Sequence, residues 1–108
     1  MIMKAYTTDL DSLSFNAFVK KGIVAVDFWA AWCGPCKISG PIFEDLASEF
    51  KGKVGFGKVD VDKNYELAQR FHVMSIPTLI FFKNGEQIER VVGALPKDVL
   101  KKKIEAFT

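Results

Sequence analysis

The sequence has few of the residues that would point to a metal site, a membrane span or a nucleic-acid surface. It contains two cysteines and one histidine, so a structural zinc ion, which takes a tetrahedral set of ligands, would require a second chain. The longest apolar run, about residues 23–32, is interrupted by Asp27 and is too short to cross a bilayer. A formal net charge of +2 predicts neither nucleic-acid binding nor attraction to a membrane.

The first residues contain no charged segment followed by a long apolar stretch, so we expect no secretory signal and a cytoplasmic location, where thiols are kept reduced. Hydrophobic residues make up 49% and charged residues 26%, which is typical of a folded globular protein and not of a disordered one. The sequence has no repeats, low-complexity tracts or linkers. We therefore expect one domain over residues 1–108, long enough to bury a core.

The two cysteines lie in the run Trp-Cys-Gly-Pro-Cys-Lys at residues 32–37. An apolar, β-branched run at residues 23–28 precedes them and predicts a strand that is covered on both faces. A helix is predicted over about residues 35–50, because apolar residues recur at every fourth position. The members of this stripe are Ile38, Ile42, Leu46 and Phe50. A Cys-x-x-Cys pair between a strand and a helix is typical of a dithiol that opens and closes.

Cys33 falls just before the predicted helix, where backbone N–H groups favour the thiolate over the thiol. Lys37 adds positive charge in the same turn. Because only the thiolate attacks a disulfide, Cys33 suits a nucleophile, and Cys36 can attack the mixed disulfide that Cys33 forms. The alternative is a disulfide that only staples the fold, but closing so small a ring stabilises a protein by only about 2 kcal/mol.

Asp27 is a carboxylate inside the apolar strand that leads to the cysteines. If it is buried, loss of solvent raises its pKa, and a carboxyl group near the cysteines can then move a proton to or from Cys36. The alternative is an aspartate at the strand edge or the surface. Lys58, in the strand expected beside it, is either its charge partner or a solvent-facing lysine.

The rest of the chain predicts three more strands, three more helices and a hairpin turn at Asn84-Gly85. The strands are expected at residues 54–61, 78–82 and 87–92, and the helices at 15–20, 64–71 and from Pro96 onward. The buried side of the last helix is expected to be Val99, Leu100, Ile104 and Phe107. A hairpin that follows helical crossovers predicts a mixed sheet with helices on both faces.

These residues together resemble the thioredoxin family, which is the standard example of a redox Cys-x-x-Cys motif. The resemblance covers about residues 15–107 and is specific, whereas an isolated Cys-x-x-Cys pair would be a weak signal. The matching segments are residues 27–37, Pro41, residues 58–60, residues 76–78, residues 82–85 and residues 92–94.

The resemblance implies an α/β thioredoxin fold, with a central five-stranded mixed sheet flanked by four helices in the order β-α-β-α-β-α-β-β-α. It implies a protein disulfide reductase, that is, a thiol–disulfide oxidoreductase and electron carrier. In this reading Cys33 is the nucleophile, Cys36 resolves, Asp27 coupled to Lys58 carries the proton, and a cis Pro77 packs beside the disulfide. The implied substrate-binding patch is apolar and consists of Trp32, Gly34, Pro35, Ile76, Pro77, Gly93 and Ala94.

The resemblance also implies the partners: a thioredoxin reductase as electron donor and disulfide-containing proteins as substrates. It implies a monomer with no metal and no bound cofactor, in which the reversible Cys33–Cys36 disulfide is the redox group. Oxidase and isomerase relatives usually carry a histidine between the cysteines, which stabilises the thiolate and makes the pair more oxidising. This chain has Gly34 and Pro35 there. The alternatives are an oxidase or isomerase, or a binding subunit that uses the apolar patch without redox chemistry.

Overall fold

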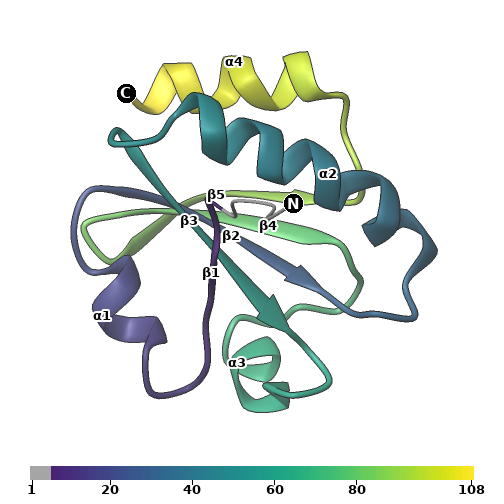
Figure 1. The fold of residues 1–108 in the computed structure, drawn as a ribbon. Coiled ribbons are helices and arrows are strands. Elements are labelled where there is room, and N and C mark those ends of the chain that lie inside the picture. The colour runs from purple at the N-terminus through teal and green to yellow at the C-terminus, as the bar shows by residue number, and fades with distance from the viewer. Residues whose placement is uncertain (1–5) are drawn as a thin grey trace, which may run out of the picture.

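The computed structural model describes residues 6–108, which form a five-stranded sheet between two pairs of helices (Figure 1). The strands are β1 (Thr8–Asp9), β2 (Ile23–Trp29), β3 (Val54–Asp60), β4 (Thr78–Lys83) and β5 (Glu86–Val92). The helices are α1 (Phe15–Val19), α2 (Gly34–Glu49), α3 (Tyr65–Arg70) and α4 (Lys97–Phe107). The predicted fold class and element order are confirmed. The first five residues, which bear on the expected lack of a secretory signal, lie outside the described part.

The strand order across the sheet is β1-β3-β2-β4-β5. Strands β1, β3 and β2 run parallel, whereas β4 and β5 pair antiparallel to their neighbours. In the central strand, Trp29 lies opposite Asp60 and Phe28 lies opposite Thr78. The C-terminal ends of β2 and β3 and the start of β4 therefore lie at the same end of the sheet. The loops that follow β2 and β3 and the loop that precedes β4 come together there.

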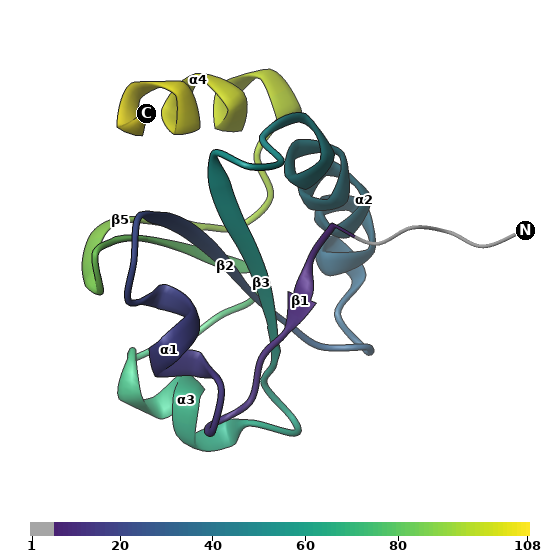
Figure 2. The same ribbon diagram turned by 60° about the vertical axis from the view of Figure 1, so that its left-hand side comes forward.

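The two helix pairs cover opposite faces of the sheet, α2 with α4 and α1 with α3 (Figures 1 and 2). Successive strand residues point to opposite faces. Val24, Val26 and Phe28 accordingly pack in a cluster with buried residues of α1 and α3, whereas Ala25 packs in a cluster with buried residues of α2 and α4. By the same alternation, Asp27 belongs to the face that α2 and α4 cover.

Two side chains expected inside are on the surface. Ile38 is 66% exposed and Val99 is 39% exposed, so placing them on the buried stripes is wrong. A spacing of four residues advances by about 40° more than a full helical turn, and the stripe that starts at Ile38 has rotated by about 120° when it reaches Phe50. Val99 lies about 100° around the helix from the buried Leu100, at the margin of the covered side.

The local sequence pattern does not predict β1, a strand of two residues that pairs with β3 through Thr8 with Gly57 and Asp9 with Lys58. Two residues cannot show the alternation of apolar and polar side chains that predicts a strand, and β1 is defined by its pairing with β3. The hairpin turn is confirmed. Asn84 and Gly85 have φ values of 51° and 89°, the positive values that a two-residue hairpin turn requires at both positions.

Within the described residues, no helix combines the length and apolarity that a membrane-crossing segment would need.

Two glycines inside β3 differ in the space around them. A Cβ at Gly57 would lie 2.5 Å from Leu10 Cδ1 and 3.0 Å from Phe18 Cε2, whereas at Gly55 the nearest atom, Val24 Cγ2, would be 3.4 Å away. Gly57 therefore lets the segment after β1 approach the sheet closely, and Gly55 is not required for that purpose.

We expect Gly57→Ala to lower the free energy of unfolding by about 1–3 kcal/mol, because the new methyl group overpacks the contact with Leu10. Gly55→Ala is the matched control in the same strand and should leave stability unchanged or raise it by up to about 1 kcal/mol. Urea denaturation followed by circular dichroism measures both. Equal losses for the two variants would contradict the packing argument.

Candidate redox site

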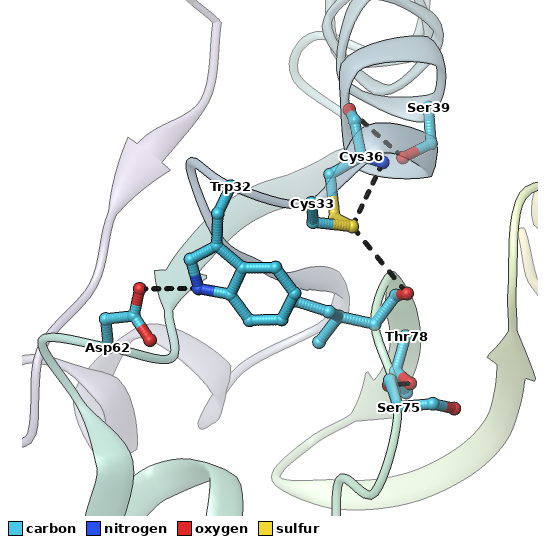
Figure 3. The surroundings of a disulfide bond; sticks show 8 residues. Trp32, Cys33, Cys36, Ser39, Asp62, Ser75 and Thr78 are labelled. Atoms are coloured by element: carbon cyan, nitrogen blue, oxygen red, sulfur yellow. Dashed lines mark hydrogen bonds between the residues drawn. A yellow bond between two sulfur atoms is a disulfide. The ribbon is translucent and has the colours of Figure 1, made fainter.

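The two cysteines form a disulfide at the start of α2 (Figure 3). Cys33 is the N-cap residue, with an extended backbone, and its Sγ accepts a hydrogen bond from the backbone N–H of Cys36 at 3.2 Å. Both side chains are buried, with 3% and 7% exposure. Because free N–H groups at a helix start favour negative charge, the structure supplies the electrostatic environment that the sequence predicts around Cys33.

The loop before β4 lies against this sulfur. The Ile76–Pro77 peptide bond is cis, as the family resemblance implies. The carbonyl oxygen of Ile76 is 3.7 Å from Cys33 Sγ. In the disulfide this sulfur carries no hydrogen, so the contact becomes a hydrogen bond only when Cys33 is a thiol. The backbone N–H of Gly93 donates to the Pro77 carbonyl at 2.8 Å and ties the loop to the end of β5.

A groove of about 570 Å³ opens beside the disulfide. It contains four of the predicted patch residues, namely Trp32, Gly34, Pro35 and Ile76, together with Cys33. Trp32 is 68% exposed, and its indole Nε1 donates to Asp62 at 2.9 Å, so the ring is held across the groove (Figure 3). A large apolar side chain that is both exposed and held in place beside a reactive bond is typical of a binding surface.

The substrate-binding patch implied by the family resemblance leaves out part of this groove. Tyr65, Asp62, Val73 and Met74 also line it, and Met74 is 91% exposed. Tyr65 is the first residue of α3, a position whose surroundings depend on how α3 is placed beside the cysteine loop. The apolar pair Val73-Met74 directly before the Ser75-Ile76-Pro77 loop was the available signal.

The other predicted patch residues, Pro77, Gly93 and Ala94, line a separate small cavity, which also contains Asp27 and Ser39. The seven patch residues are thus divided between a groove and a cavity and do not form one continuous hollow. The cavity brings the buried carboxylate and the proline loop together.

Asp27 is 2% exposed, which excludes the surface alternative. Burial raises the pKa of Asp27 from 3.8 to about 6, an increase that the positive charge of Lys58 opposes and the negative charge of Glu44 reinforces. Its Oδ1 atom has no hydrogen-bond partner among the described residues. A carboxyl group with this pKa exchanges protons close to neutral pH.

Lys58 lies opposite Asp27 in the register of β2 and β3, so its expected position beside that carboxylate is confirmed. Its side chain is only 18% exposed, so Lys58 is not the solvent-facing lysine of the alternative prediction. The Nζ atom is 3.8 Å from Glu44 Oε2 and 4.9 Å from the centre of the Trp29 ring. Lys58 therefore interacts with two carboxylates and an indole.

Across residues 6–108, no group of three or more histidine, cysteine, aspartate or glutamate side chains is placed to hold a metal ion. The redox group that the structure does contain is the Cys33–Cys36 disulfide.

Comparison with known proteins agrees with this geometry. Residues 6–106 match the model of the Thioredoxin family. The chain belongs to the thioredoxin family. It is 50% identical over 92 residues to the thioredoxin of Staphylococcus saprophyticus, and the aligned region covers 85% of this chain and 88% of that protein. It is also 50% identical over 93 residues to the thioredoxin of Staphylococcus aureus strain Mu50, with 86% of each chain covered.

Two solved thioredoxins have the same fold. The thioredoxin of Malassezia sympodialis (Mala s 13) is 39% identical with a TM-score of 0.86, covering 99% of this chain and 95% of that one. A mutant thioredoxin from Halobacterium salinarum NRC-1 is 34% identical with a TM-score of 0.88, covering 100% of this chain and 96% of that one.

The function predicted from the sequence is confirmed at the level of reaction class. The chain is a protein disulfide reductase, an oxidoreductase that acts on disulfides, and thioredoxin-family partners are in general disulfide-containing substrates and reductases.

Burial of Asp27 makes stability depend on pH. The folded protein keeps a proton on the Asp27 carboxyl group up to about pH 6, whereas an aspartate in the unfolded chain loses its proton near pH 3.8. The stability that protonated Asp27 contributes is therefore fully present below about pH 3.8 and is lost as the pH rises through about 6. We expect oxidised Asp27→Asn to gain about 2–3 kcal/mol over wild type at about pH 7.5 relative to about pH 4.

Urea denaturation at both pH values measures this gain. The difference between the two is the readout, because any packing cost of the amide is the same at both. Asp45→Asn removes the same charge from an exposed position and is the control. A gain for Asp27→Asn that is equal at the two pH values would rule out the titration of Asp27 as its cause.

Proposed function

We propose that the chain reduces substrate disulfides in two exchange steps carried by Cys33 and Cys36. The Cys33 thiolate attacks one substrate sulfur, the substrate S–S bond breaks, and the other substrate sulfur leaves as a thiolate. Cys36 then attacks Cys33, which releases the first substrate sulfur and forms the Cys33–Cys36 disulfide. The substrate gains two electrons and the cysteine pair loses two. The observation that carries this proposal is the hydrogen bond from the Cys36 N–H to Cys33 Sγ at the start of α2.

Asp27 is proposed as the group that takes the proton from Cys36 in the second step. The support is its burial, a pKa of about 6 and its place in the cavity that Pro77 also lines. Near neutral pH, Asp27 is ionised in most of the molecules and can accept a proton. With a pKa of about 6, the carboxylate is also basic enough to hold that proton briefly. Lys58 is the charge partner that moderates the cost of burying the ionised form.

The proposed substrate surface follows the loops around the disulfide. Trp32, Gly34, Pro35 and Ile76 would contact one side of an extended substrate segment through the groove. Pro77, Gly93 and Ala94 would contact the other side, where the proline loop meets the end of β5. An extended substrate segment can lie over this surface because Trp32, Gly34, Pro35 and Ala94 are exposed, whereas Pro77 is buried beneath it.

The finer partner assignments are also proposals. A thioredoxin reductase would restore the dithiol by donating two electrons to the Cys33–Cys36 disulfide. We propose that the chain works as a monomeric single domain over residues 1–108, in the cytoplasm and with no bound cofactor. Support comes from the family match over most of the chain and from a redox group that consists of two of its own side chains.

Substitution of the cysteines separates their two roles. Cys36→Ser should keep the first attack but not the second, so it should accumulate a covalent adduct with a disulfide substrate. Cys33→Ser should form no adduct, and both variants should lose turnover in insulin reduction driven by dithiothreitol. Non-reducing mass spectrometry detects the adduct, and the double variant is the control. Stronger trapping by Cys33→Ser than by Cys36→Ser would reverse the assigned roles.

Trp32→Ala should raise the KM for a protein disulfide substrate about 10-fold and change kcat little, because the indole contributes to binding and not to sulfur exchange. Leu13→Ala is the control, since Leu13 is 94% exposed and does not line the groove. Steady-state kinetics over a range of insulin concentrations gives both constants. An unchanged KM for Trp32→Ala would remove this side chain from the substrate surface.

A further inference from the structure

We propose that Glu44 is a positioning residue for the proton transfer at Asp27: it draws the Lys58 ammonium toward itself and so weakens the attraction that keeps Asp27 ionised. The inference rests on the proposed role of Asp27 in disulfide reduction and adds a third charged group to that role.

The Lys58 ammonium lies between two carboxylates. Lys58 and Asp27 are direct partners in the register of two parallel strands. Glu44 belongs to α2, which covers the face of the sheet to which Asp27 belongs (Figure 2). Glu44 Oε2 is 3.8 Å from Lys58 Nζ, and among the described residues Glu44 is the ion-pair partner of Lys58. The cation is thus shared between a buried carboxylate and one that is 38% exposed.

The Glu44 side chain is held in place by a hydrogen bond. The Thr7 hydroxyl donates to Glu44 Oε2 at 2.8 Å, so the oxygen that lies nearest Lys58 also has a hydrogen-bond partner. Thr7 directly precedes β1, and Asp9 of β1 is the strand partner of Lys58. An ion pair between two free surface side chains would be weak because both must be ordered, and this hydrogen bond supplies part of that order.

The charges around Asp27 have opposite signs and oppose each other in their effect on its pKa. Among the described residues, Lys58 from β3 and Glu44 from α2 are the charged groups that shift the pKa of Asp27. The strand partner from β4 is Leu79, and Leu100 from α4 lines the same cavity, so these two elements present apolar side chains. Ser39 of α2 is polar but uncharged, and the cysteines do not titrate while they form a disulfide. Glu44 raises the pKa of Asp27 and Lys58 lowers it.

The test is a titration of Asp27 in the oxidised protein, in which no thiol interferes. The NMR shift of its side-chain carboxyl carbon is followed against pH and assigned with Asp27→Asn. Glu44→Gln should move the midpoint to lower pH by about 0.5 unit, because the pair is partly exposed and screened. Lys58→Met should move it to higher pH. Asp45→Asn is the control, because Asp45 is the next residue of α2 and its charge acts on Lys97 of α4. It should leave the midpoint unchanged.

A double variant distinguishes positioning from simple repulsion. If Glu44 acts by drawing Lys58 away, Glu44→Gln should shift the midpoint less in the Lys58→Met background than in wild type. Equal shifts in the two backgrounds would overturn the positioning role, as would a Glu44→Gln midpoint equal to that of wild type.

An activity measurement separates this inference from the proposed function. At about pH 6, Glu44→Gln should reduce insulin about 1.5-fold faster than wild type, because more Asp27 is ionised, and the two should be equal at about pH 8. Failure of wild type to accelerate insulin reduction over dithiothreitol alone would overturn the proposed function. An active wild type whose pH profile Glu44→Gln does not move would overturn only the role of Glu44.

Discussion

The site depends on the register in which β2 pairs with β3 on one side and with β4 on the other. This register places Asp27 opposite Lys58 and sets Phe28 and Trp29 beside the start of β4 and the end of β3. A slip by one residue would turn every side chain of β2 to the other face and expose Asp27 to the α1 and α3 cluster. The apolar residues on both faces of β2 oppose such a slip, so the core of the sheet and the geometry of the site are stabilised by the same contacts.

The electrostatics of the site act against its stability. An ionised carboxylate with 2% exposure is unfavourable in an apolar core, and a protein selected for stability alone would place an apolar side chain there. Lys58 offsets part of this cost, but its ammonium is shared with Glu44 and the Trp29 ring, so the compensation is incomplete. The result is a group whose pKa, about 6, lies close to neutral pH, as the proposed proton transfer from the Cys36 thiol to Asp27 requires.

Prediction succeeded where a signal is local. The Cys-x-x-Cys spacing, the apolar strand before it and the Asn84-Gly85 turn each depend on neighbouring residues, and all are confirmed. It failed where a position depends on a partner element. Ile38 and Val99 fit apolar spacings on their helices, but the neighbours of each helix cover a narrower arc than the spacing suggests. β1 is too short to show a pattern, and Tyr65 joins the groove only because α3 lies beside the cysteine loop.

The chemistry of the site is already present in the sequence: one pair of thiols at a helix start, one carboxylate within an apolar strand, and no histidine between the cysteines. These follow from residue type and from contacts within a few residues, and the family resemblance adds their reaction class. The interactions among the charged groups, in contrast, depend on the packing of the whole fold. Glu44, Lys58 and Thr7 are far apart in the chain, and their distances depend on how α2, β3 and the segment before β1 pack together. Burial and charge separation are properties of that packing, and no local pattern encodes them.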